Sequence, residues 1–531
     1  MTEKNSNHLK FRLKCIIILF FMMYIPVMQA IIPLPVIPAT QFLITGYGAS
    51  TSSSDNASFI NAAIIAANSA GGGTVVIPAG TFLSGPITMK SNVNLYISTG
   101  AILQILPYGN GNGSPAGSYP NNGTVDTYAN FIFGSGLNNI EVSGQGIIEG
   151  NGSAWWTAYN ANNNIERPCL IRFKACNTVL ITGITLQNSP NVHVTLGESS
   201  SSGSNGTISN ITVIAPSTSP NTDAIDTWYW NGINITHCNL SEGDDNVAMN
   251  SYSHNVTVTD CTFGSGHGVS VGSYGISVEN IVVDSCTFNG TTNGIRLKSE
   301  RGRGGADSSF VYSNLSMTNV QYPIYITSWY PKEPYPASAQ VAAPLTSTTP
   351  IWKNILFKNI TITNSTYGGI IYGLPEAYIS NIVFDNVQLK ATKSGLIANY
   401  ITGLVFQNCS SITLPTGKGN AIIPYNATIA GINSTTGIST DCNLAGITDL
   451  SSNPLLSCFP NPLAGDNLTV TAENTISKVK VYTLTGVEIK EGEGNHSMQL
   501  QVNMTGISPG YYIVNVELEN GIIRSMKLIK E

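Results

Sequence analysis

The residues best suited to chemistry are ionisable side chains that recur at equal intervals. Asp223 lies in SPNTDAIDTW, Asp245 follows 22 residues later in EGDDNVAM, and His267 follows 22 residues after that in GSGHGVSVGS. Asp244 directly precedes Asp245, and neighbouring side chains on a strand point to opposite faces, so both can reach one surface only where the backbone turns. Clustered carboxylates without a metal motif suit acid and base catalysis, because like charges keep one group protonated while another stays ionised. Hydrolysis of a glycosidic bond requires this division.

Two cations follow in NGIRLKS, where Arg296 and Lys298 flank Leu297. On a strand, Arg296 and Lys298 share one face while Leu297 points into the core. They supply a local positive patch suited to sugar carboxylates. The whole chain has a net charge of −6 and only 10% charged residues, so no global basic field recruits nucleic acid.

A repeat of about two dozen residues must position these side chains. Cys238, Cys261 and Cys286 lie 23 and 25 residues apart, each in a short apolar strand followed by a turn rich in Gly, Asn and Ser. One copy buries only one edge, so copies must stack, and the absence of helical segments predicts an all-β fold, a right-handed parallel β-helix. Residues one period apart then lie above each other at about 4.8 Å, and the cysteines form an interior ladder.

An N-terminal cap helix is expected in DNASFINAAIIAANSAGGG, which begins at Asp55. Asp55 or Asn56 is the expected N-cap and Gly71 the stop. The apolar residues on one helical face, which would cover the open end of the β-helix, are Ile60, Ala63, Ile64 and Ala67.

The two ends of the chain have other roles. Residues 1–30 combine basic residues, a short apolar run and a small-residue end, which predicts a secretory signal peptide cleaved near Ala30. Residues 31–438 are the expected β-helix domain and residues 439–457 a linker. Residues 458–531 alternate apolar and polar side chains, and Asn520-Gly521 is a hairpin turn signal, so they predict a small C-terminal antiparallel β-sandwich.

The motifs NTD, DD, GHG and RLK, in this order and spacing, resemble the polygalacturonases of glycoside hydrolase family 28, and the resemblance covers most of residues 38–410. It implies that Asp244 is the general acid and that Asp223 and Asp245 activate the attacking water. It implies that His267 tunes the protonation of the acid. The residues implied to bind substrate are Asn221, Arg296, Lys298 and Tyr330.

The same resemblance implies inversion at the anomeric carbon, a pectic polysaccharide substrate (homogalacturonan is favoured), and no metal or other cofactor. The nine cysteines contain no CxxC pair, which also argues against structural zinc. The chain departs from the family at Ala224, Leu297 and Asn246, and the sequence offers no interpretation of Asn246. Asp226 is taken as structural because it lacks a partner in the column.

The C-terminal FPNP, VKVYTLTG and ISPGYYIVNV resemble the sorting domain of the type IX secretion system. This implies that the secretion machinery is a partner, and that the protein is released or attached to the cell surface. A carbohydrate-binding β-sandwich is the alternative reading of this tail. A monomer is expected.

Other functions remain open at this stage. Rhamnogalacturonan and xylogalacturonan hydrolases share the family, a calcium-dependent pectate lyase shares the fold, and a surface β-helix could bind polysaccharide without cutting it. Residues 107–128 and 300–309 could close the cleft, so the sequence does not decide between endo and exo action.

Overall fold

The computed structural model describes residues 32–109, 117–124, 126–334, 340–442, 456–472, 474–483, 488–519 and 523–531. The predicted signal peptide, residues 1–30, lies outside them. The described chain forms two compact units, divided after Cys442. Among these residues, no helix is long and apolar enough to cross a membrane.

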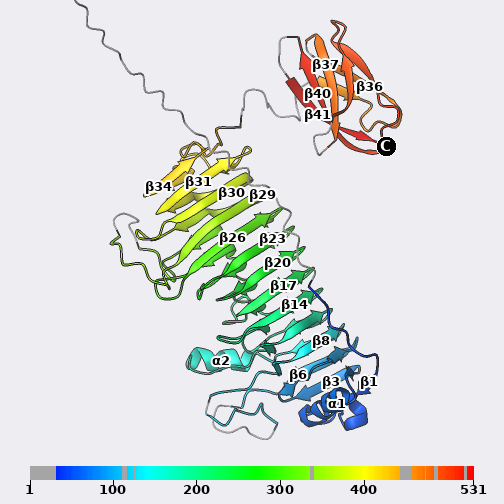
Figure 1. Ribbon diagram of the computed structural model, residues 1–531, viewed down its shortest axis with the longest axis vertical. Helices are drawn as coiled ribbons and strands as arrows, with labels where there is room; N and C mark the ends of the chain where they lie inside the picture. The colour runs from blue at the N-terminus through cyan, green and yellow to red at the C-terminus, as the bar shows by residue number, and fades with distance from the viewer. Residues whose placement is uncertain are drawn as a thin grey trace, which may run out of the picture. The chain divides into compact units, whose positions relative to one another are not determined.

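The first unit is a right-handed parallel β-helix, whose coils follow one another in chain order from α1 to β34 (Figure 1). Its strands form three parallel stacks. The first stack consists of β1 (Gln41–Leu43), β2 (Gly73–Ile77), β5 (Val93–Ile97), β8 (Asn138–Gly144), β11 (Asn177–Thr182), β14 (Gly203–Ser209), β17 (Trp230–Thr236), β20 (His254–Thr259), β23 (Glu279–Asp284), β26 (Ala306–Ser313), the start of β29 (Ile351–Tyr372), the start of β30 (Ile379–Asn399), β31 (Ile401–Gln407) and β34 (Ala427–Ala430).

The second stack consists of β3 (Gly80–Ser84), β6 (Ala101–Ile105), β9 (Ile147–Glu149), β12 (Thr185–Gln187), β15 (Thr212–Ile214), β18 (Asn239–Ser241), β21 (Thr262–Phe263), β24 (Thr287–Asn289), β27 (Ser316–Thr318), the middle of β29 and β30, and β32 (Ser411–Thr413). The third stack, which carries the chemistry described below, consists of β4 (Ile87–Thr88), β7 (Ile132–Ser135), β10 (Ile171–Lys174), β13 (Val194–Leu196), β16 (Ile225–Thr227), β19 (Val247–Met249), β22 (Val269–Val271), β25 (Asn293–Lys298), β28 (Tyr322–Thr327), the ends of β29 and β30, and β33 (Ile422–Pro424).

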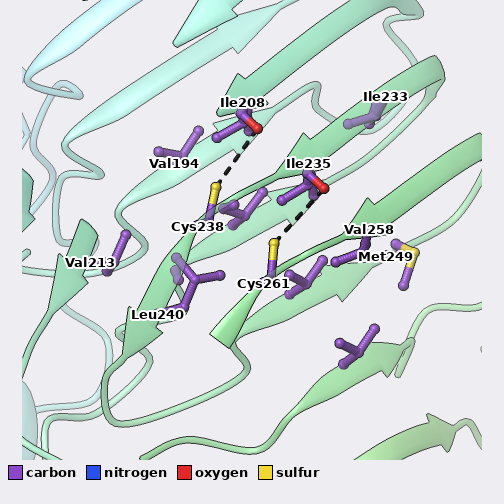
Figure 2. Close-up of a cluster of buried hydrophobic side chains, with 14 of the residues drawn as sticks. Val194, Ile208, Val213, Ile233, Ile235, Cys238, Leu240, Met249, Val258 and Cys261 are labelled. Carbon is purple, nitrogen blue, oxygen red and sulfur yellow. Dashed lines mark hydrogen bonds between the residues drawn. The ribbon is translucent and has the colours of Figure 1, made fainter. Parts of the chain in front are cut away.

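The coils stack for a simple chemical reason. Each strand buries alternate apolar side chains, and one coil alone would leave its backbone edge unpaired, so stacking satisfies both requirements. Figure 2 shows the interior cysteine ladder, in which the Cys238 thiol donates to the Ile208 carbonyl (3.7 Å) and the Cys261 thiol donates to the Ile235 carbonyl (3.9 Å). Both cysteines are buried, and so is Cys286, which confirms the predicted ladder.

The ends of the β-helix are closed differently. At the N-terminal end lie η1 (Ile44–Tyr47) and α1 (Ala57–Ser69), and the four apolar residues predicted to face the core are buried. The Ala57 amide at the start of α1 donates to Asp55 Oδ1 (2.8 Å), which satisfies one free amide of the first turn. A second helix, α2 (Ser153–Ala161), is inserted between β9 and β10.

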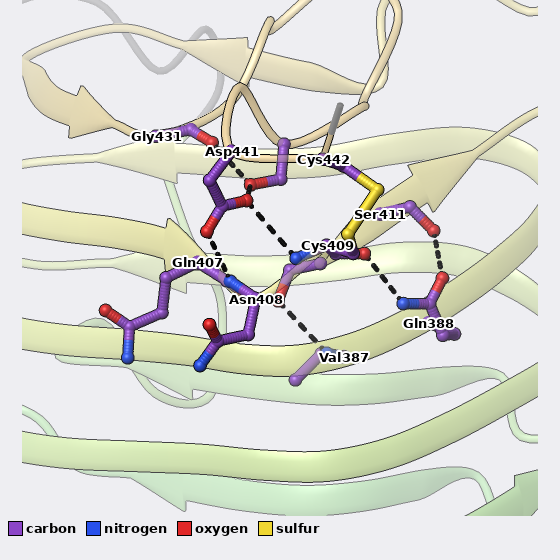
Figure 3. Close-up of a disulfide and its surroundings, with 11 residues drawn as sticks. Val387, Gln388, Gln407, Asn408, Cys409, Ser411, Gly431, Asp441 and Cys442 are labelled. Atoms are coloured by element: carbon purple, nitrogen blue, oxygen red, sulfur yellow. Dashed lines mark hydrogen bonds between the residues drawn. A yellow bond between two sulfur atoms is a disulfide. The ribbon is translucent and has the colours of Figure 1, made fainter. Parts of the chain in front are cut away.

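At the other end, a disulfide joins Cys409 to Cys442 (Figure 3). The Asp441 carboxylate accepts hydrogen bonds from the amides of Asn408 (2.6 Å) and Cys409 (3.2 Å). Residues 439–442, which the sequence assigned to the linker, are thus bound to the last coil of the β-helix.

The second unit is a pair of antiparallel sheets. One sheet contains β35 (Leu456–Phe459), β36 (Asn467–Ala472) and β39 (Gln499–Asn503), and the other contains β37 (Ile476–Thr483), β38 (Glu488–Glu493), β40 (Gly510–Leu518) and β41 (Ile523–Lys530). Its core includes Val470, Val479 and Val514. The antiparallel pairing of β40 with β41 agrees with the predicted hairpin, although Asn520-Gly521 itself lies outside the described residues.

Candidate active site

The third strand stack brings the predicted column together. Ile225 of β16 pairs with Val247 of β19, and Val247 pairs with Val269 of β22. Each of these residues lies two positions after a member of the column, so Asp223, Asp245 and His267 occupy equivalent places in consecutive coils. This register agrees with the 22-residue spacing.

The aspartate pair lies where the chain turns from β18 into β19, as the sequence argument required. Asp244 Oδ1 is 3.1 Å from His267 Nδ1, and Asp245 Oδ1 is 3.7 Å from the same nitrogen. Asn246 holds this turn, because its Oδ1 accepts a hydrogen bond from the Gly268 amide (2.8 Å) and its Nδ2 donates to the Ser265 carbonyl (2.9 Å). The departure from the family at Asn246 therefore has a structural explanation.

Asp245 is the electrostatic centre of the site. It is 2% exposed, its Oδ2 lies 2.7 Å from Lys298 Nζ, and its Oδ1 lies 2.9 Å from Arg296 Nη1. The hydroxyl of Ser270, on β22, donates to the same Oδ1 at 2.7 Å. Burial by itself raises the pKa of Asp245, but Lys298, Arg296 and His267 outweigh it and hold that pKa well below the ordinary range of an aspartate. Asp245 is therefore ionised at neutral pH.

Arg296 and Lys298 project from one face of β25, while Leu297 between them is fully buried, as predicted. Arg296 Nη1 also lies 3.0 Å from His267 Nδ1. Both cations face Tyr330, whose ring centroid lies 5.7 Å from the guanidinium carbon and 5.3 Å from Lys298 Nζ. Each cation keeps further N–H groups beyond those on Asp245, so the pair can also bind an incoming carboxylate.

Three other carboxyl groups differ from Asp245, because their pKa values are raised. Burial, with neighbouring acidic groups, raises the pKa of Asp223 and of Glu242 well above the ordinary range, and raises the pKa of Asp226 to about 8. Glu242 is fully buried, and its Oε1 accepts a hydrogen bond from Asn246 Nδ2. One ionised carboxylate, Asp245, thus lies among acids that retain their protons, which is the division that acid and base catalysis needs.

Asp226 has no ionisable neighbour in its own column, as the sequence indicated, because it pairs with Thr195 on one side and with Ala248 on the other. Pairing continues from Ala248 to Ser270 and from Ser270 to Arg296, so Arg296 lies in the same outward column, three coils away. Asp226 also lines the cleft beside Asp223.

Arg167 is a site residue that sequence reasoning missed. It is 6% exposed, its Nη1 donates to the carbonyls of Pro190 and Pro220 (both 2.7 Å), and its Nη2 donates to Asn221 Oδ1 (2.8 Å). Its guanidinium lies 3.7 Å from the ring centroid of Tyr159, on α2. Arg167 therefore fixes the loop that carries Asn221 toward Asp223, and the only sequence signal was its place in RPCLIRF.

Two surface hollows border the site, one at Asp223 and the other at Tyr330. A hollow of about 1090 Å³ is lined by Asp223, Asp226, Asn221 and Arg167 together with side chains of β7 and β10. A smaller hollow of about 280 Å³ is lined by Arg301, Trp329 and Tyr330 among others. Residues from the two segments that could close the cleft line these hollows, Asn122 in the first and Glu300 in the second.

The contacts of Asp245 decide whether a metal ion fits this site. Asp244, Asp245 and His267 bring one donor atom each within 4.8 Å of one another. Both oxygens of Asp245 are, however, bound by the cations Arg296 and Lys298, which would repel a divalent ion at this point. The arrangement fits acid and base chemistry and does not fit a metal.

A parallel β-helix that brings carboxylates, a histidine and two cations together at one place fits the class of polysaccharide-cleaving enzymes. Within that class, the family model described as "Glycosyl hydrolases family 28" matches residues 69–411, and the chain belongs to this family. It is accordingly a hydrolase of glycosidic bonds. The model "Secretion system C-terminal sorting domain" matches residues 457–531, so the protein is secreted or attached to the cell surface.

Individual relatives agree with this assignment. An endo-polygalacturonase of Pectobacterium carotovorum subsp. carotovorum is 32% identical over 362 residues, which cover 63% of this chain and 85% of the relative. The solved polygalacturonase from Erwinia carotovora ssp. carotovora is 28% identical, with a TM-score of 0.58, and covers 75% of this chain and 99% of its own. The family 28 exopolygalacturonase of Yersinia enterocolitica shares the fold at 18% identity, with a TM-score of 0.59, covering 76% and 79% of the two chains.

Proposed function

We propose that the protein is a secreted polygalacturonase that hydrolyses α-1,4 galacturonosyl linkages of pectin by acid and base catalysis with inversion. The observation that carries this proposal is the packing of Asp244, Asp245 and His267 against Arg296 and Lys298. The carboxyl groups supply proton transfer, and the cations match the carboxylate that every unesterified galacturonate carries. The family and the names of its relatives support the substrate class.

The roles follow from the contacts. Asp244 is half-buried, lies 3.1 Å from His267 and donates its proton to the glycosidic oxygen. The imidazole of His267 influences the protonation of Asp244. Asp223 and Asp245 activate the attacking water. Asp245 is ionised and accepts the proton of that water, whereas Asp223, whose raised pKa keeps it protonated in the free enzyme, binds the water and becomes a base only after losing its own proton. Inversion rests on family membership.

Substrate binding is assigned to the polar residues around this centre. Arg296, Lys298 and Tyr330 bind galacturonate carboxylates, and Asn221, held by Arg167, shapes the adjacent subsite. No metal or other cofactor takes part, because cations of the protein already neutralise Asp245.

The domain roles form part of the proposal. Residues 1–30 are the export signal, and residues 31–438 form the catalytic domain. Residues 439–442 are bound to the last coil of that domain. Residues 458–531 direct the protein to the type IX secretion system. A net charge of −6 gives no attraction for nucleic acid, and the enzyme works as a monomer.

The test is the product formed from polygalacturonate with a chelator present, followed by reducing ends and by the absorbance of unsaturated uronides. The proposal expects reducing ends without the unsaturated chromophore. Chromophore that requires added calcium would indicate a lyase and overturn the proposal. If polygalacturonate gives no product but rhamnogalacturonan or xylogalacturonan gives reducing ends, the protein has another activity of the same family.

A further inference from the structure

A second cationic surface lies in the hollow that Asp223 lines, two coils before Asp223 and three coils before the aspartate pair. On β10, Ile171 and Phe173 are fully buried, so the alternating residues Arg172 and Lys174 face outward. Both line the hollow that contains Asp223. Three strand steps separate β10 from β19, which places this surface about 14 Å from the turn that bears the aspartate pair.

The positive charge of this surface is only partly balanced. Glu198 is shared by the two cations, since its Oε1 lies 3.7 Å from Arg172 Nη2 and its Oε2 lies 2.5 Å from Lys174 Nζ. About a third of each of these three side chains is exposed, so they are accessible from the cleft. The hollow is also lined by Arg167 and Glu166, so three cations face two ionised carboxylates there, while the raised pKa values of Asp223 and Asp226 keep those two groups protonated at neutral pH.

An aromatic side chain completes the surface. Phe133 on β7 pairs with Arg172 in the strand register and is half-buried, with its neighbours Ile132 and Gly134 turned into the core. Phe133 also lines the hollow. An apolar ring beside exposed cations suits a hexuronate, because the C–H face of the sugar packs on the ring while the carboxylate meets the cations.

We propose that Arg172, Lys174 and Phe133 form a distal subsite that binds the carboxylate of an unesterified galacturonate, a few sugar residues from the cleaved bond. Glu198 holds the two cations in place in the free enzyme. Methyl-esterified residues lack the charge, so this subsite selects de-esterified stretches of the polymer. The inference rests on the proposed function, from which it takes the uronate.

The test compares the variants Arg172→Gln, Lys174→Gln and their combination with a matched control, Lys390→Gln, which removes an exposed cation on β30 that lies outside both hollows. Initial rates are measured on long oligogalacturonates and on the shortest oligomer that the wild type cleaves. The double variant is expected to raise KM for the long substrate about tenfold, from the loss of charge-assisted hydrogen bonds, with kcat unchanged. The rate on the short oligomer, which does not reach β10, is expected to stay at the wild-type value.

A binding measurement separates this inference from the proposed function. Calorimetric titration of long oligogalacturonate into Asp244→Asn protein, with and without the two β10 substitutions, reports the subsite without turnover. Two results support the subsite. The double variant binds the oligomer more weakly, and its affinity depends less on salt concentration than the affinity of the protein without the β10 substitutions. Unchanged affinity overturns it, even if the wild type hydrolyses polygalacturonate, as does an equal loss on short and long substrates. A wild type that neither binds nor cleaves polygalacturonate overturns both proposals.

Discussion

Replacing Lys298 with methionine tests whether its ammonium keeps Asp245 ionised in the folded protein. Lys298 Nζ lies 2.7 Å from Asp245 Oδ2, and both residues are buried. At an effective dielectric constant of about 20, two charges at this distance attract by roughly 6 kcal/mol. Desolvation offsets part of this, and Arg296 and Ser270 still hold Oδ1, so we expect a net loss of about 3 kcal/mol at neutral pH. That loss corresponds to a rise of roughly two units in the pKa of Asp245.

The sign of the pH dependence follows from linkage. Asp245 has a pKa below its unfolded value, so it stabilises the fold above about pH 4 and loses this contribution as the pH falls. The wild type is therefore expected to exceed Lys298→Met in stability by about 3 kcal/mol at pH 7 and by clearly less only near pH 2, which lies below the raised pKa of Asp245 in the variant.

The assay is urea unfolding of the β-helix at both pH values, with Lys390→Met as a control that removes an exposed lysine. The control is expected to match the wild type at each pH. An equal destabilisation of Lys298→Met at both pH values would refute the reasoning, because the lysine would then contribute through packing alone.

Three further predictions concern other buried polar groups. Asp226→Asn removes a neighbouring acid that raises the pKa of Asp223, so the acid limb of the kcat/KM profile is expected to move to lower pH. Asp307 is fully buried and its pKa is raised to about 8, so the folded state retains a proton and stability falls between about pH 4 and 8, by up to roughly 1.4 kcal/mol per pH unit; Asp307→Asn is expected to flatten this dependence in thermal unfolding. Arg167→Ala leaves two buried carbonyls unpaired and frees Asn221, so kcat/KM on polygalacturonate is expected to fall by about 10²-fold or more, with partial recovery in Arg167→Lys.

Each of these predictions can fail in a distinct way. If the acid limb of the kcat/KM profile is unchanged in Asp226→Asn, Asp226 has a structural role only. A pH dependence of unfolding that survives in Asp307→Asn would assign it to the other buried acids. Arg167→Ala with wild-type kcat/KM would show that the Asn221 loop holds its position without the guanidinium.

The sequence predicted the fold and the core of the site because both depend on one period. When strands stack at a constant interval, residues 22 positions apart must align, which placed Asp223, Asp245 and His267 together before any coordinates. Alternation on a strand likewise placed Arg296 and Lys298 on one face.

The remaining site residues depend on contacts that no spacing encodes. Arg167 binds backbone carbonyls of Pro190 and Pro220, and carbonyls leave no trace in a pattern of side chains. Ser270 matters only because its hydroxyl donates a hydrogen bond to the buried Asp245, and the sequence pattern does not show this contact. The repeat period therefore predicts which charged residues align. Hydrogen bonds to backbone carbonyls, or from small side chains such as Ser270, can be identified only from the structure.

The most direct test of the account measures kcat on polygalacturonate for Asp244→Asn beside Asp260→Asn, which changes an exposed aspartate of the same β-helix. Loss of the general acid is expected to lower kcat by about 10²- to 10⁴-fold, while Asp260→Asn keeps wild-type activity. Both proteins should unfold at the wild-type temperature. A folded Asp244→Asn protein with wild-type kcat would contradict the assignment of the acid and, with it, the mechanism proposed for the cleft.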